Sequence, residues 1–264
     1  MKTYALFLGC NIESRLPGYG EDAERVLDAL GIKTVRLRDF SCCGYPLKNP
    51  DAGAAALAAA RNLAVARARG LDILTLCSCC HGGLTTSQWL LQNDPAVGEK
   101  AAAHLAADGL EYAPDVRVRH FLNVLDEEAG TDAIQSRVKK PRPGVKVAVQ
   151  YGCHLLRPSR VTRVDDPFEP TVGERLLAAA GVTPVAWERR MDCCGAPVLF
   201  LYPDDARRLA DKKIASAADA ADELATVCTY SYLFFQSRMR EKDPALSLTT
   251  PAGVLALAMG LKKG

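Results

Sequence analysis

The sequence has few of the features that mark export, membrane insertion or nucleic-acid binding. Its first apolar run, residues 4–8, is too short for the apolar region of a secretory signal. No stretch approaches the roughly 18 apolar residues that a membrane span requires. The net charge of +2 gives no reason to expect a nucleic-acid partner. We therefore expect a cytoplasmic protein with no membrane span and no bound nucleic acid.

The sequence also lacks a dinucleotide-binding fingerprint, because no Gly-x-Gly-x-x-Gly follows a predicted strand. The apolar content of 48% and charged content of 24% are those of an ordinary globular protein. The 264 residues are enough for one large domain or two of about 130 residues each. A chain of this size needs no disulfide staples. Its ten cysteines therefore favour metal or redox chemistry over a disulfide framework.

All ten cysteines fall into two constellations with the same order. The first contains Cys10, Cys42, Cys43, Cys77, Cys79 and Cys80, and the second contains Cys153, Cys193, Cys194 and Cys228. Each includes an adjacent pair followed by glycine, and Ser231 stands where the first set has Cys80. Residues 193–198 repeat residues 42–47 at an offset of 151, and residues 174–181 repeat residues 24–31. So long a period indicates two similar domains, which we place at residues 1–143 and 144–264.

Predicted strands alternate with predicted helices in both halves. Apolar runs at 2–9, 32–37, 71–76, 145–152 and 224–227 predict strands, and the main helical patterns lie at 23–31, 49–69, 81–93, 97–109, 120–128, 174–181 and 203–222. This alternation predicts an α/β fold, with a small parallel sheet flanked by helices in each domain. Four cysteines (Cys10, Cys77, Cys153 and Cys228) follow predicted strands directly. The cysteines should therefore converge at the carboxyl edge of each sheet.

Several kinds of site could use these sulfurs. Free cysteines often act as small buried apolar side chains, but the repeated spacing argues against that role. Zinc could bind four of them, although structural zinc usually uses two CxxC knuckles and an adjacent pair is awkward for one tetrahedral ion. An adjacent pair suits a larger iron–sulfur cluster, in which different irons each need a ligand. The four thiolates of the second set would suffice for an ordinary cubane cluster or for zinc.

The doubled C…CCG…CxxC pattern resembles the cysteine-rich CCG domains of the heterodisulfide reductase B subunit family. Residues 151–158 (Tyr-Gly-Cys-His-Leu-Leu-Arg-Pro) are similar to the start of the second CCG domain in the proteins of that family. CCG domains also occur in glycolate oxidase iron–sulfur subunits, lactate-utilisation proteins and anaerobic glycerol-3-phosphate dehydrogenase. The resemblance covers essentially the whole chain.

The resemblance implies that five cysteines of the first half bind a non-cubane four-iron, four-sulfur cluster and form the catalytic site. By motif position these are Cys10, Cys42, Cys43, Cys77 and Cys80. Cys79 is then an extra cysteine, and its replacement is expected to cost little. The implied ligands of the second half are Cys153, Cys193, Cys194 and Cys228, with Ser231 in the fifth place, for a second iron–sulfur cluster or zinc. Ser231 departs from the family pattern, and this fits better with the sulfur-oxidising, heterodisulfide reductase-like complexes.

The activity implied is that of an oxidoreductase subunit acting on disulfide, thiol or persulfide sulfur. A ferredoxin-like iron–sulfur C subunit and a flavin-containing A subunit would exchange electrons with it, and a lipoate-bearing carrier protein is a further candidate partner. Two other functions stay open: an electron-transfer subunit for lactate or glycolate oxidation, and a zinc-stabilised interaction module.

Three further expectations concern residues around the two sites. His154 follows Cys153 and is a candidate catalytic residue, because a histidine beside a cluster can relay protons. The apolar stretches 199–202 and 230–235 are either contacts for partner subunits or parts of the core. The two sites are expected to face each other across a cleft between the halves.

Overall fold

A computed structural model describes residues 2–242 and 245–262 as two α/β halves, each built on a parallel sheet of four strands. The strand order is β2–β1–β3–β4 in the first sheet and β6–β5–β7–β8 in the second. The strands are β1 (Thr3–Phe7), β2 (Lys33–Arg36), β3 (Asp72–Thr75), β4 (Val118–His120), β5 (Lys146–Gln150), β6 (Thr183–Val185), β7 (Glu223–Thr226) and β8 (Ser247–Thr249). The predicted fold class is confirmed.

The central strands are apolar because helices cover both faces of a parallel sheet. In β1, Ala5 lies opposite Val35 of β2 and Ile73 of β3, and β5 occupies the same central place between β6 and β7. Three of the outer strands, β4, β6 and β8, have only three residues each. The sequence did not predict these three strands, because so short a segment shows no apolar pattern.

Helices and short helical turns connect the strands and cover the sheets. The first half contains α1 (Gly9–Arg15), α2 (Pro17–Ala29), η1 (Tyr45–Leu47), α3 (Ala52–Arg67), α4 (Ser78–Asn93), α5 (Pro95–Ala107), α6 (Phe121–Val124), η2 (Leu125–Ala129) and α7 (Gly130–Arg137). The second contains α8 (Cys153–Leu156), α9 (Ser159–Thr162), α10 (Val172–Ala179), η3 (Ala196–Val198), α11 (Pro203–Ala218), α12 (Thr229–Lys242) and α13 (Pro251–Ala258). Within the described ranges, none of these helices is long and apolar enough to cross a bilayer.

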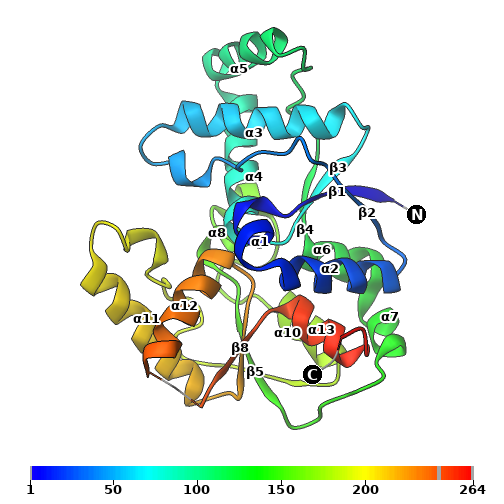
Figure 1. Ribbon diagram of the computed structural model, residues 1–264, viewed down its shortest axis with the longest axis vertical. Helices are drawn as coiled ribbons and strands as arrows, with labels where there is room; N and C mark the ends of the chain where they lie inside the picture. The colour runs from blue at the N-terminus through cyan, green and yellow to red at the C-terminus, as the bar shows by residue number, and fades with distance from the viewer. Residues whose placement is uncertain (1, 243–244, 263–264) are drawn as a thin grey trace.

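The two halves exchange helices across their junction. Helix α13 follows the last strand of the second sheet but packs on α2 of the first half (Figure 1). Helices α6 and α7 follow the last strand of the first sheet and pack on α10 of the second half. As a result, one apolar core contains Val26 and Leu27 of α2 together with Val254 and Leu255 of α13. The division into domains 1–143 and 144–264 stays a prediction, and its outermost residues, 1 and 263–264, lie outside the described residues.

The glycine after each cysteine pair allows its loop to pass against a helix. Gly44 has a φ of 81° and Gly195 a φ of 82°, a region that favours glycine. A Cβ atom at Gly44 would lie 2.7 Å from the carbonyl oxygen of Ala55 on α3, and one at Gly195 would lie 2.4 Å from that of Ala206 on α11. The glycine therefore fixes where the adjacent cysteine pair enters the site.

Candidate metal centre

The first cysteine set gathers at the carboxyl edge of the first sheet, as predicted. Cys10 lies in the first turn of α1, just after β1, while Cys77 precedes α4 and Cys80 lies in its first turn, just after β3. The pair Cys42-Cys43 approaches from the loop between β2 and η1. Cys43, Cys77 and Cys80 are buried, whereas Cys10 and Cys42 are exposed. The five predicted ligands of the first site therefore include three buried cysteines and two that are exposed to solvent.

The thiols of this set influence one another's ionisation. Hydrogen bonds from the Cys42 and Cys80 thiols hold the pKa of Cys43 below its ordinary value. Burial, together with the charge of Cys43, raises the pKa of Cys10. Cys77 also raises the pKa of both Cys10 and Cys80.

The second set has the same arrangement on the second sheet. Cys153 begins α8 after β5, Cys228 follows β7, and the pair Cys193-Cys194 lies between β6 and η3. Cys194 and Cys228 are buried, Cys153 is half-buried, and Cys193 is exposed. A hydrogen bond from the Cys194 thiol lowers the pKa of Cys193 to about 6. Ser231 is buried near Cys194, and its hydroxyl has no hydrogen-bond partner of ordinary geometry among the described residues.

A buried lysine that was not predicted from the sequence supports the second cysteine pair. Lys213 of α11 is 0% exposed, and its Nζ donates hydrogen bonds to the carbonyl oxygens of Arg189, Arg190 and Asp192 at 2.6, 3.1 and 2.7 Å. Burial lowers the pKa of Lys213 to about 8. The lysine thus fixes the loop that leads into Cys193. The spacing in α11 could have revealed it, because Lys213 follows Ala206 and Ala210 by seven and three residues on the buried face, whereas its neighbour Lys212 is exposed.

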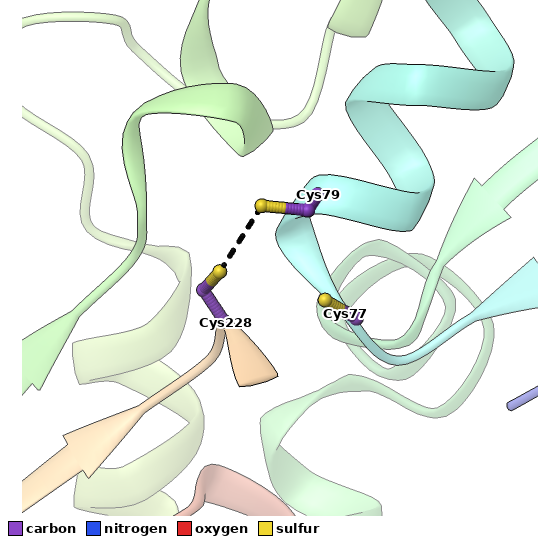
Figure 2. A group of neighbouring side chains, drawn as sticks. All are labelled: Cys77, Cys79 and Cys228. Carbon is purple, nitrogen blue, oxygen red and sulfur yellow. Dashed lines mark hydrogen bonds between the residues drawn. The ribbon is translucent and has the colours of Figure 1, made fainter. Parts of the chain in front are cut away.

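The two cysteine sets meet at the junction of the halves. The sulfurs of Cys77, Cys79 and Cys228 all lie within 4.8 Å of one another, and the Cys79 and Cys228 sulfurs are 3.4 Å apart (Figure 2). Thr229 crosses the same junction, with its hydroxyl 3.1 Å from the Cys77 sulfur. A cavity lined by Cys79 of the first half and by residues of the second lies beside this contact. The two cysteine sets therefore approach each other between the halves, while their expected roles as two metal sites across a cleft stay a prediction.

His154 connects the second set with the first half. Its Nε2 atom lies 2.7 Å from Lys48 Nζ, and its Nδ1 atom lies 3.3 Å from Cys153 Sγ and 3.5 Å from the Tyr45 hydroxyl. Burial and the charge of Lys48 lower the pKa of His154 to about 4, so the ring is neutral near pH 7. An ammonium can only donate, so Nε2 accepts from Lys48 and the ring proton resides on Nδ1, where it faces Cys153 and Tyr45.

Two other histidines have structural partners. The His81 ring lies 3.2 Å from the Thr162 carbonyl oxygen across the junction, and the His120 ring lies 3.2 Å from the Leu76 carbonyl oxygen. Burial lowers the pKa of His81 to about 4 and that of His120 to about 3, so both are neutral near pH 7. These rings hold backbone segments together.

The donor atoms of both sets fit a metal cluster or ion. Their thiols cannot all ionise by themselves, because several negative charges in one partly buried volume repel one another. A bound cation removes this obstacle by deprotonating its thiol ligands. Soft sulfur donors suit iron–sulfur clusters and zinc. At the second site, the Ser231 hydroxyl and the Gln150 Oε1 atom have no hydrogen-bond partner within the described part of the chain, and both residues line the same cavity. This fits a site completed by a bound group.

Comparisons with known proteins agree with this doubled architecture. The family model of the cysteine-rich domain CCG matches residues 4–85 and 147–236, one copy in each half. The chain is 31% identical to a protein of Archaeoglobus profundus that resembles the B subunit of heterodisulfide reductase, over 98% of this chain and 91% of that protein. It is 30% identical to the B subunit of a ferredoxin/F420H2-dependent CoB-CoM heterodisulfide reductase of Methanosarcina acetivorans, over 98% and 90%.

Two further comparisons concern a fumarate reductase subunit and a solved structure. The chain is 31% identical to the membrane anchor subunit of an 8-methylmenaquinol:fumarate reductase of Wolinella succinogenes, over 98% of this chain and 93% of that protein. The crystal structure of a hypothetical protein from Helicobacter pylori superposes with a TM-score of 0.75 at 17% identity. That match covers 99% of this chain and 50% of the other, so the chain spans half of that protein's length and shares its fold.

Proposed function

Because the chain belongs to the family of cysteine-rich CCG-domain proteins and is a homologue of the heterodisulfide reductase B subunit, we propose that it is an iron–sulfur redox protein that acts on a sulfur substrate within a larger complex. The observation that carries this proposal is the convergence of Cys10, Cys42, Cys43, Cys77 and Cys80 at one sheet edge. These five would hold a non-cubane four-iron, four-sulfur cluster. The second set would hold a second iron–sulfur cluster or zinc.

A cluster bound there would supply single electrons and an iron able to take up sulfur. The chain's own residues keep one side of the site open at Cys10 and Cys42, where a disulfide, thiol or persulfide can enter. His154 holds its proton at Nδ1, between the second set and Tyr45. In the disulfide reaction, two electrons and two protons convert RSSR′ into RSH and R′SH, and the S–S bond is the bond that breaks.

Reduction of a disulfide by the cluster-loaded protein tests this proposal. The protein, reduced by an excess of a viologen dye, is mixed anaerobically with a small asymmetric disulfide. We expect two dye molecules to be oxidised and two thiols to be released for each disulfide consumed. Loaded protein that releases no thiols would contradict a role in sulfur chemistry.

A second candidate function is electron relay without a sulfur substrate. It is favoured by the similarity to a fumarate reductase subunit and by Ser231, which interrupts the second cysteine set. In that case the loaded protein takes electrons from the dye and passes them to an acceptor subunit, but releases no thiols. The disulfide experiment therefore separates the two functions.

Electron exchange with other subunits needs a docking surface, and the structure offers a candidate. Phe200, Leu201 and Tyr202 are 92%, 77% and 61% exposed, whereas Phe234 and Phe235 of the other apolar stretch are buried in the core. Phe200 also lines a groove of about 790 Å³ that extends to Asn11, the neighbour of Cys10. We propose that a ferredoxin-like iron–sulfur subunit docks here. A flavin-containing subunit and a lipoate-bearing carrier protein are the further partners that we propose, and we place the complex in the cytoplasm.

Replacing Phe200 by aspartate is expected to weaken association with the iron–sulfur partner. An exposed aromatic side chain that becomes buried at an interface often contributes about 2 kcal/mol or more, which corresponds to roughly 30-fold in affinity. Binding of the co-expressed partner to each variant measures the effect. Phe168→Asp is the matched control, because Phe168 is also exposed, at 76%, and lies outside this stretch. Equal losses from both variants, or no loss from Phe200→Asp, would place the interface elsewhere.

Replacing His154 by alanine is expected to weaken metal binding at the second site only. The variant loses the Nδ1–H group 3.3 Å from the Cys153 sulfur, and partners that orient a metal ligand typically contribute 10- to 100-fold, so we expect a loss of about 10-fold. Competition with a chelator measures it. His154→Asn retains an N–H donor and should recover part of the affinity. An unchanged second site in His154→Ala would show that this contact has no role there.

A further inference from the structure

Cys79 is the one cysteine for which the repeated motif has no use, yet it lies at the centre of the junction. It belongs to the first turn of α4 and is 3% exposed. Figure 2 shows its sulfur pointing away from α4, across the junction toward Cys228, with 3.4 Å between the two sulfurs. The sequence predicts that Cys79 is dispensable. That prediction rests on the motif alone, whereas in the structure the Cys79 thiol faces the cysteine set of the other half.

Cys79 lines the cavity of the second site. Cys153, Cys194, Cys228 and Ser231 of the second set line this cavity, and Cys79 is its lining residue from the first half. Gln150 and Ser231 are 2% and 1% exposed, and each contributes to the cavity wall a side-chain oxygen without a hydrogen-bond partner among the described residues. Buried polar atoms of this kind indicate a site that a bound group completes.

The duplication explains how a residue of one half reaches the site of the other. Tyr230 occupies the position 151 residues after Cys79. Burial raises the pKa of Tyr230, and the charges of Cys10, Cys79 and Cys43 add to this rise. The Tyr230 ring is 5.5 Å from the ring of Tyr45 of the first half. Tyr230 also lines the second-site cavity together with Cys79, so both residues of this repeated position lie at the junction of the halves.

We propose that Cys79 is a metal ligand of the second site and supplies the thiolate that Ser231 cannot. This inference rests on the proposed function in that it takes the second set to be a metal site. The second site would then have five sulfur donors from two halves: Cys79, Cys153, Cys193, Cys194 and Cys228. The ammonium group of Lys213 is buried and interacts electrostatically with Cys194 and Cys193. Its positive charge offsets part of the negative charge of five thiolates.

Metal analysis of single variants tests this assignment. Wild type, Cys79→Ala, Ser231→Ala and Cys80→Ala are loaded anaerobically in the full-length protein with iron and sulfide or with zinc. Iron, zinc and sulfide are quantified for each, and EPR spectra are recorded. Cys194→Ala identifies the second-site signal by its loss. We expect Cys79→Ala to bind metal at the second site at least about 10-fold more weakly, since a direct ligand should matter no less than its supporting partners. The first-site signal of Cys79→Ala should persist, and Ser231→Ala should retain both.

The double variant Cys79→Ala/Ser231→Cys separates a ligand from a packing residue. It returns a thiol to the same cavity from the second half, so we expect it to recover second-site metal. The assignment is overturned if Cys79→Ala keeps its second-site metal, or if the double variant stays empty there while Ser231→Cys alone loads normally. It is also overturned if the wild type binds no metal at the second site. Absence of iron at the first site would instead contradict the proposed function.

Discussion

Replacing Cys43 by alanine is expected to remove the cluster of the first site and leave the fold intact. Cys43 is 5% exposed, and its thiol interacts with those of Cys42 and Cys80, so its loss removes a buried sulfur from the set. We expect the affinity for the cluster to fall by more than about 100-fold, beyond the effect of removing a partner that only orients a ligand. Iron and sulfide content, with visible absorption and EPR spectra, measure the loss.

Cys194→Ala is the matched control for Cys43→Ala, because Cys194 has the same place in the second set. That variant should lose the second-site signal and keep that of the first. If Cys43→Ala retained the iron and sulfide of the wild type, the first-site ligand assignment would be wrong.

Replacing Lys213 by methionine is expected to destabilise the protein by about 3 kcal/mol. The substitution keeps a side chain of similar length but leaves three partly buried carbonyl oxygens without their shared donor. A hydrogen bond to a charged group contributes about 1.5–3 kcal/mol before the loop relaxes. Urea unfolding of the metal-free protein measures the change in the free energy of unfolding. Metal-free protein is used so that lost metal does not add to the difference.

Lys212→Met provides the control, since Lys212 is the exposed neighbour of Lys213 on α11. Its substitution should change the free energy of unfolding by less than about 0.5 kcal/mol. Equal stability of the two variants would show that the loop before Cys193 does not depend on the lysine.

The duplication and the positions of the cysteines at strand ends follow from the sequence because both are local patterns. Cys10 and Cys77 follow apolar runs long enough to be recognised as strands, and the rule for parallel sheets then brings them to one edge. Helix α13 also has a local signal that was overlooked: Thr250 accepts a hydrogen bond from the Gly253 N–H, and Pro251 occupies the first turn.

Other features depend on contacts between the halves, which the sequence does not encode locally. Helix α13 packs on the first half, and helices α6 and α7 pack on the second. The spacing of apolar residues does not reveal this exchange, because each helix is amphipathic or apolar whichever half it covers. The same holds for Cys79. Its spacing in Cys77-Ser78-Cys79-Cys80 marks it as surplus, and the packing of α4 against α8 brings it to the second site.

Metal and sulfide analysis of the anaerobically prepared wild-type chain, combined with EPR, tests the central claim most directly. We expect about four irons and four sulfides at the first site, on ligands whose loss in Cys43→Ala removes the signal. Chain that carries zinc without iron or sulfide under these conditions, and is colourless, would contradict the assignment of this protein as an iron–sulfur redox subunit.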